Sequence, residues 1–325
     1  MTTMKRAKST KYDVLFQKNV YLCPEMKQSL SILIPTFNDD CTSLIEVLSA
    51  QASQIEGLDW EIVVGDDGST DSSVVNRNQQ ACSLSCCRYL RVEQNRGRAA
   101  IRNYLARSAQ YDTLLFLDCH VEVGDRFLQN YVEYDGSESV VCGGVKAGGN
   151  EEQWKGNLRY RYERAAEQRH NVEERRKRPY QSFRTTNILV NKDTALSHPF
   201  DEQFRDYGYE DVLYGKRLKE QNVSIAHMSN EVAIAQYESN ERYVEKMEEA
   251  LHTLKKFAPE LEGYSRLLSL ANRIESWHLG GVVGGLFGLT KGMLRRQLCG
   301  SNPSLQLFTA YRLGQLVRLK MKDEN

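Results

Sequence analysis

Four short apolar segments, separated by stretches with helical periodicity, constrain the fold of this chain more than any other feature of its sequence. They lie at residues 31–35, 61–65, 89–92 and 113–117. Mostly apolar runs of this length are typical of strands that are buried on both faces. Residues 42–54 and 97–109 carry apolar side chains at helical spacing. This alternation predicts an α/β fold, in which a mostly parallel sheet has helices on both faces.

Polar side chains follow three of these segments at the point where each segment ends. They are Thr36 and Asn38 after the first, Asp66 and Asp67 after the second, and Asp118 and His120 after the fourth. In open α/β sheets, ligands bind beyond the carboxyl ends of the strands. The sequence therefore predicts a polar ligand site at this edge of the sheet.

The second half of the chain is less regular but predicts further elements. Strands are expected at 140–144 and 188–190, and helices at 151–178, 209–221, 241–257 and 260–320. With 325 residues, of which 41% are hydrophobic and 26% charged, the chain is long enough for one large folded domain and an appendage. We expect a polar lead-in over 1–29, the α/β domain over 30–240 and a helical C-terminal extension over 241–325.

Charge and cysteine content limit the partners and the compartment. Basic and acidic residues are equal, with 43 of each, so no net charge draws the chain to nucleic acid, which we do not expect as a partner. Eight cysteines without a CxxC pair give no zinc-ribbon spacing. The basic first residues are not followed by the apolar run of a secretory signal. We therefore expect a reducing, cytoplasmic setting.

Two acidic elements at the strand ends have both a structural and a functional interpretation. The segment DDGS at 66–69 has the composition of a simple turn. Asp118 and His120, two residues apart after a buried strand, point the same way, and both can bind a divalent cation such as Mn²⁺. The structural alternative for this pair is a strand end that is partly exposed.

Arginines and a Glu-Asp pair complete the candidate residues. Arg96, Arg98 and Arg102 share one predicted helix, where they would either face solvent or contact phosphate oxygens. Glu210 and Asp211 begin another helix, where they would either complement the helix dipole or supply a general base. The motifs GxxxxGKS/T, GxGxxG, HExxH and GxSxG are absent, which weakens the kinase-like, dinucleotide-binding, zinc-protease and hydrolase interpretations.

Six segments occur in the order and spacing of a known family. They are SILIPTFN at 31–38, EIVVGDDGSTD at 61–71, NRGRAAIRN at 95–103, LLFLDCH at 114–120, FRTTNILVN at 183–191 and GYED at 208–211. Over about residues 30–257 the chain resembles the inverting glycosyltransferases of family 2. The resemblance implies their GT-A fold, a Rossmann-like, mostly parallel sheet with helices on both faces.

The resemblance also implies a nucleotide-sugar donor, a UDP-sugar, at the strand ends. The residues that would bind it are Pro35, Phe37 and Asp67 around the base, Arg98 and Arg102 at the nucleotide or phosphate, and Asp118 at the ribose or a metal. Asp118 and His120 would hold a divalent cation, Mn²⁺ or Mg²⁺, that neutralises the departing diphosphate.

Two departures from the family pattern concern this cation. His120 stands where the family has the last Asp of its DXD motif, and an imidazole favours Mn²⁺ over Mg²⁺. Where many relatives place a later metal-binding His, near 230–232, this chain has Ala233 and Ile234, and His227 lies out of register. The cation site therefore has one carboxylate fewer than the family pattern.

The acceptor side of the resemblance rests on the Glu-Asp pair. Asp211, next to Glu210, would deprotonate an acceptor hydroxyl, so that the product has inverted configuration. The implied acceptor is a growing glycan or a lipid-linked sugar. Two alternatives are a metal-dependent nucleotidyltransferase and a non-catalytic nucleotide-sugar-binding scaffold. The first needs a basic loop near the first strand, where residues 35–40 are acidic, and the intact Glu-Asp pair argues against the second.

Two segments outside these motifs allow opposite interpretations. Residues 159–178 predict either a solvated helix or a basic mobile segment that closes over the donor diphosphate or an anionic acceptor. Gly280, Gly284, Gly288 and Gly292 lie at four-residue spacing in an apolar stretch that is too short to span a bilayer. We expect a peripheral membrane contact there, at the inner face of the cell membrane, or a groove for a partner helix. The alternative is a core helix, or two helices broken by glycine pairs.

Overall fold

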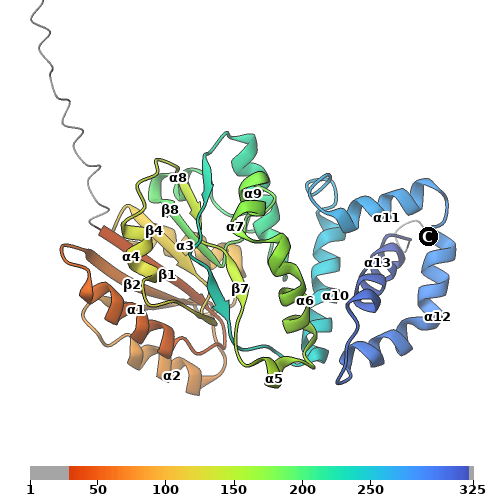
Figure 1. The fold of residues 1–325 in the computed structure, drawn as a ribbon, viewed down its shortest axis with the longest axis horizontal. Helices are drawn as coiled ribbons and strands as arrows, with labels where there is room; N and C mark the ends of the chain where they lie inside the picture. Colours follow the sequence, from red (N-terminus) through yellow and green to blue (C-terminus); the bar gives the residue numbers. More distant parts are fainter. Residues whose placement is uncertain (1–28, 322–325) are drawn as a thin grey trace, which may run out of the picture.

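The structure is a computed structural model that describes residues 29–321 (Figure 1). The predicted lead-in therefore lies outside the described residues, except for Ser29, which begins the first strand. A large sheet with its helices forms one side of the molecule, and a group of C-terminal helices forms the other (Figure 1).

The large sheet has seven strands in the order β3-β2-β1-β4-β8-β6-β9. The first four are the predicted apolar segments, β1 (Ser29–Thr36), β2 (Asp59–Asp66), β3 (Cys87–Arg91) and β4 (Thr113–Leu117). They pair in parallel, so their carboxyl ends meet at one edge. The remaining strands are β6 (Val140–Cys142), β8 (Asn187–Asn191) and β9 (Ile225–His227), and β8 is antiparallel to both β4 and β6. The mostly parallel sheet is confirmed.

Helices cover both faces of this sheet, as predicted. On one face, α1 (Thr42–Gln54) and α4 (Phe127–Val132) contribute Leu48 and Phe127 to a core with alternate strand residues such as Ile32. On the other face, the core includes Leu33 of β1 and side chains of three further helices. These helices are α3 (Arg98–Ser108), α8 (Lys192–Ser197) and α9 (Glu210–Glu220).

Some elements carry too weak a sequence signal to be predicted. Helix α2 (Ser72–Ala81) has only two buried valines, and its start is fixed by Asp71, whose carboxylate accepts hydrogen bonds from the Ser73 and Val74 backbone N–H groups. A second sheet in the order β5-β10-β7 consists of strands of two or three residues. These strands are Val121–Glu122, Val232–Ile234 and Val145–Ala147.

The prediction of a single helix over 151–178 is wrong, because three asparagines each cap the start of a new helix. The observed pieces are α5 (Glu151–Trp154), α6 (Leu158–Ala166), the 3-10 turn η1 (Glu167–Arg169) and α7 (Val172–Lys177). Asn150, Asn157 and Asn171 cap the three α-helices by accepting hydrogen bonds from backbone N–H groups in their first turns. Each cap favours a new helix start over continuation.

Neither interpretation of the basic segment describes Arg175, which is only 3% exposed. Its guanidinium donates to the carbonyls of Cys142, Gly143 and Met228 and pairs with Glu231 at 2.9 Å. It therefore ties α7 to the sheet and is neither solvated nor free to close over a substrate.

His227 is a buried member of β9 and belongs to the same structural cluster as Arg175. Its Nδ1 lies 3.2 Å from an Arg175 nitrogen, and its Nε2 lies 2.9 Å from the carbonyl oxygen of Pro179. Burial lowers the pKa of His227 to about 4, so the imidazole is neutral. Both ring nitrogens are thus engaged in the fold.

Four helices form the C-terminal part: α10 (Asn240–Lys256), α11 (Arg266–Ser276), α12 (Gly280–Cys299) and α13 (Leu305–Met321). The helices predicted there are confirmed, and the division predicted at residue 240 coincides with the start of α10. One buried cluster nevertheless joins Phe204 and Leu213 of the sheet part to Leu251, Leu268 and Leu316. Residues 241–325 as a separate extension therefore remain a prediction.

The four glycines at four-residue spacing in α12, here called the glycine ridge, pack against α13 from Gly280 to Gly288. A Cβ added at Gly284 would meet Met321 Sδ at 2.7 Å, and one added at Gly288 would meet Arg318 at 3.1 Å. Helix α13 contributes a glycine of its own, Gly314, whose Cβ would meet the Phe287 ring at 2.4 Å. Small residues thus let the two helices approach closely. Among the helices of residues 29–321, none combines the length and apolar character needed to cross a membrane.

Candidate active site

The nine residues that the sequence singled out line two neighbouring cavities beyond the strand ends. The strand-end cavity, of about 550 Å³, is lined by Pro35, Phe37, Asp67, Arg98, Arg102, Asp118 and His120. The helix-side cavity, of about 530 Å³, is lined by Arg98, Arg102, Asp118, His120, Glu210 and Asp211. Four of the nine line both cavities, so the two cavities form one continuous candidate site.

At the strand-end cavity, the turns that follow β1 and β2 are bonded to each other. Asn38, with a φ of 56°, accepts hydrogen bonds at Oδ1 from the backbone N–H groups of Thr70 and Asp71. Asn is one of the few residues that tolerate this left-handed conformation. Phe37, beside it, is 43% exposed. The turn therefore presents an aromatic ring at the cavity from a fixed backbone.

Asp67 holds the loop that leads into α3. Its carboxylate accepts hydrogen bonds from the backbone N–H groups of Arg96 at 2.9 Å and Gly97 at 2.8 Å. Burial raises the pKa of Asp67, although these bonds favour the charged form. The predicted contact of Asp67 with a base stays a prediction. What the structure describes is a carboxylate that positions the start of the helix bearing Arg98 and Arg102.

Arg102 links the two cavities. Its side chain is 2% exposed, and it pairs with Asp118 Oδ1 at 3.0 Å and with Glu210 Oε1 at 3.5 Å. Its Nε is buried and has no hydrogen-bond partner among residues 29–321. Burial opposes the ionisation of Asp118, but Arg102, His120 and Arg98 outweigh it and hold the pKa of Asp118 well below its usual range.

The residues around His120 fit a divalent cation in part. The Asp39 carboxylate, the Cys119 thiol and the His120 imidazole lie within 4.8 Å of one another. Burial lowers the pKa of His120, which leaves a neutral ring with a free lone pair. Burial raises the pKa of the Cys119 thiol, and a protonated thiol is a poor ligand. Asp39 and His120 are thus the available ligands.

Asp118, predicted as a metal ligand, has both oxygens engaged by the protein. Oδ1 pairs with Arg102, and Oδ2 accepts a hydrogen bond from Thr186 at 2.9 Å. Sequence reasoning did not select Asp39. Its signal is the acidic turn directly after β1, which ends at the same edge as β4.

Asp211 lies in the first turn of α9, after a turn with unusual backbone geometry. Gly208 and Tyr209 have φ values of 96° and 68°. Burial and the neighbouring charge of Glu210 raise the pKa of Asp211 to about 6, against the opposing effect of Arg184. A carboxylate with this pKa is suited to accept a proton near neutral pH.

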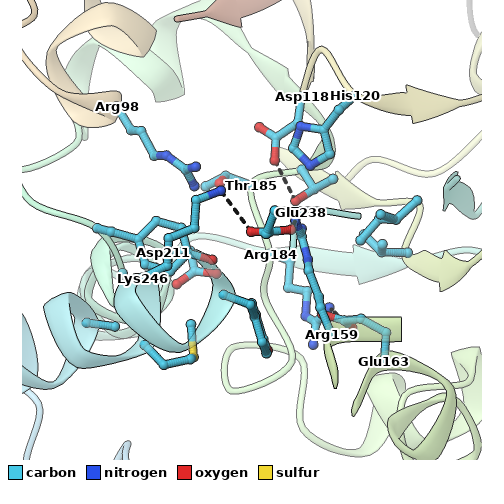
Figure 2. A pocket seen from close by; sticks show the side chains of 18 of the residues that line it. Arg98, Asp118, His120, Arg159, Glu163, Arg184, Thr185, Asp211, Glu238 and Lys246 are labelled. Carbon is cyan, nitrogen blue, oxygen red and sulfur yellow. Dashed lines mark hydrogen bonds and ion pairs between the residues drawn. The ribbon is translucent and has the colours of Figure 1, made fainter. Parts of the chain in front are cut away.

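The helix-side cavity also contains charged residues that no motif indicated. Arg159 pairs with Glu238 at 2.7 Å, Glu238 also pairs with Lys246 at 2.8 Å, and Arg184 pairs with Glu163 at 3.2 Å. Figure 2 shows these residues in one pocket with Asp118, His120 and Asp211. They come from α6, α10 and two connecting segments. Arg159 and Glu163 belong to the charged segment 159–178 that the sequence indicated, whereas Arg184, Glu238 and Lys246 lie in no local pattern that would have selected them.

Comparisons with known proteins agree with this geometry. A family model described as glycosyl transferase family 2 matches residues 31–194, about half of the chain. A chondroitin synthase of Escherichia coli is 31% identical over 105 residues, and one of Pasteurella multocida (strain Pm70) is 29% identical over 106. Each match covers 32% of this chain, and the matched parts span only 15% and 11% of those relatives.

Solved structures with a similar fold cover most of the chain. TarS 1-349 of S. aureus has a TM-score of 0.50 at 17% identity and covers 91% of this chain and 92% of its own. The mannosyltransferase PcManGT from Pyrobaculum calidifontis, solved with GDP-Man and Mn²⁺, has a TM-score of 0.52 at 15% identity, covering 91% and 86%. At these identities the likeness shows the fold alone, and the GT-A fold is thereby confirmed.

Proposed function

Because this chain belongs to glycosyl transferase family 2, we propose that it transfers a sugar from a nucleotide-diphosphate donor to a hydroxyl group of an acceptor. The donor proposed is a UDP-sugar, and the acceptor a glycan or a lipid-linked sugar. The observation that carries the proposal is the position of Asp211, a carboxylate with a raised pKa, in the cavity that Asp118 and His120 also line. The cytoplasmic location remains a prediction.

The strand-end cavity supports the donor assignment. Phe37 offers an exposed ring for stacking against a base. Arg98 lines both cavities, and the buried Nε of Arg102 is without a partner in the described chain. An oxygen of a diphosphate would supply such a partner, since guanidinium groups bind phosphate oxygens well.

Asp39 and His120 would hold the divalent cation of this family, with Asp118 beside them. A cation there would stabilise the negative charge of the departing diphosphate. A neutral imidazole and a single free carboxylate favour Mn²⁺ over Mg²⁺. The mannosyltransferase PcManGT was solved with Mn²⁺, which agrees with this choice.

The chemistry proposed is a single displacement. The acceptor oxygen attacks the anomeric carbon and forms the new bond while the bond from that carbon to the diphosphate oxygen breaks. The electron pair leaves with the nucleoside diphosphate, and the acceptor proton passes to Asp211. Attack from the face opposite the leaving group inverts the configuration. Arg184 limits the rise in the pKa of Asp211 that burial and Glu210 cause.

The test is Asp211→Asn, which keeps the shape of the side chain but cannot accept the proton. We expect the sugar-transfer rate to fall by about a hundredfold or more, with nucleotide-sugar affinity within about twofold of the original. Asp193→Asn is the matched control, because Asp193 also lies in the first turn of a short helix, α8. An Asp211→Asn enzyme with full turnover would refute the role of Asp211.

A further inference from the structure

Helix α12 leaves a row of large apolar side chains uncovered. Val282, Leu286, Leu289 and Met293 are 68%, 62%, 87% and 67% exposed. Their spacing of three and four residues places them on one face of the helix. Trp277, just before the helix, is 61% exposed. We call these five residues the α12 stripe. Between Val282 and Met293 it extends over about 16 Å of helix.

The stripe lies apart from the glycine ridge, which α13 already covers from Gly280 to Gly288. Figure 1 shows α12 at the side of the molecule farthest from the sheet. Soluble proteins seldom expose so many neighbouring large apolar side chains without a partner. We therefore expect a partner to cover the stripe, and the charged residues near it indicate what kind of partner this is.

The charged residues of α12 and α13 are all basic, although Lys291 and Arg295 pair with glutamates of α10 and Lys320 pairs with Glu275 of α11. From Leu279 to Met321 the chain has no Asp or Glu and six Lys or Arg residues. Two of the six, Arg296 and Arg318, are exposed and form no ion pair within residues 29–321. Arg296 follows Met293 by three residues, on the same face of the helix, and Arg318 lies across Gly288.

We propose that the α12 stripe rests in the surface of an anionic lipid bilayer, with the helix parallel to the membrane. An apolar face flanked by arginines, with an indole near its start, has the composition of an interfacial helix. A second copy of the chain fits less well, because its own α12 and α13 would bring further positive charge and no acidic residue to pair with Arg296 and Arg318. Helix α13 packs on α12 and also contributes Arg312 to the lining of the helix-side cavity, so the proposed membrane surface and the candidate site are joined by one helix.

The first test is co-flotation of the full chain with vesicles of phosphatidylcholine alone or with 30% phosphatidylglycerol. We expect binding to the anionic vesicles that weakens as salt is raised. The double variant Leu286→Gln/Leu289→Gln should lower the affinity by about tenfold or more. The control Leu84→Gln/Leu196→Gln, which changes two exposed leucines of the sheet part, should bind as the original does.

The second test distinguishes binding through the α12 stripe from a general attraction of basic residues to anionic vesicles. Arg296→Glu/Arg318→Glu should abolish binding, whereas Arg169→Glu/Arg178→Glu, with the same change of net charge at two other exposed arginines, should not. Brominated lipids should quench Trp277 fluorescence, and Trp277→Phe should remove that quenching, since Trp60 and Trp154 lie in the sheet part.

Three outcomes would overturn the proposal. One is equal vesicle binding by the stripe variants and their controls. Another is quenching that survives Trp277→Phe, which would place the membrane contact elsewhere. The third is a dimer, seen by light scattering without lipid, that Leu286→Gln/Leu289→Gln converts to a monomer while the original chain ignores vesicles.

Discussion

The guanidinium of Arg102 holds two carboxylates that come from distant parts of the chain. It pairs with Asp118, which follows β4, and with Glu210, which begins α9. The residues themselves could be selected from the sequence, because strand ends and helix starts are visible there. Their pairing could not, because 108 residues separate Arg102 from Glu210 and no local pattern fixes the distance. The same holds for Arg184, whose charge acts on Asp211 across the fold.

A pH profile tests this electrostatic arrangement at the residue scale. Asp211 must be ionised to accept a proton, so the transfer rate should rise with pH through its pKa of about 6. Arg184→Gln removes a nearby positive charge that favours the ionised form, and should move the acidic limb of the profile to higher pH. Arg184→Lys should restore part of the original position.

The measurement is kcat/KM against pH from about 5 to 8 in the three enzymes. Arg178→Gln, which changes an exposed arginine outside both cavities, is the control. A profile in Arg184→Gln that is lower but unshifted would mean that Arg184 does not act on the base.

At the scale of elements, the turn before α9 decides where the Glu-Asp pair points. Gly208 and Tyr209 are both in the left-handed region of backbone space. The strongly apolar strands were predictable because burial on both faces gives a continuous apolar run, and the longer helices because burial on one face gives a helical period. Helix α2 and the strands of the small sheet were not, since they are short or mostly polar and depend on contacts made by the rest of the fold.

Gly208→Ala should distort this turn. The new Cβ would lie 2.9 Å from the Cβ of Ala250, at a φ of 96° that side-chain-bearing residues rarely adopt. We expect a lower melting temperature, a stability loss of about 1–3 kcal/mol, and a loss of transfer activity.

Gly285→Ala is the matched control for this change. Gly285 lies within a helix with nothing within 4 Å of the added Cβ, so alanine there should stabilise the protein by about 0.5–1 kcal/mol. Thermal unfolding followed by circular dichroism checks both. An unchanged melting temperature in Gly208→Ala would show that the turn carries no such restraint.

At the scale of the whole molecule, the C-terminal helices share a core with the helix that carries Asp211. Leu213 of α9 belongs to the same buried cluster as Leu251, Leu268 and Leu316. The sequence indicated these helices and their apolar faces, but not their partners, because amphipathic spacing shows which side is buried and not what buries it. The polar start of α10 suggested a domain boundary at residue 240, but the buried cluster contains residues from both sides of it.

Leu316→Ala should therefore destabilise the entire protein. Leu316 is fully buried, and truncation of such a leucine costs about 2–5 kcal/mol. We expect one unfolding transition at a lower temperature. Leu307→Ala, on the same helix but 36% exposed, should have little effect. Two separate transitions, with the sheet part unaffected, would contradict a shared core.

Arg102 also couples the strand-end cavity electrostatically to the helix-side cavity. A cation that attracts the Asp118 carboxylate leaves the guanidinium freer to neutralise Glu210, and this lessens the repulsion that disfavours a negative charge on Asp211. Thermodynamic reciprocity then requires that a proton on Asp211 disfavour that ligand. A cation bound beside Asp118 would thus lower the pKa of Asp211 and favour the ionised base that accepts the acceptor proton.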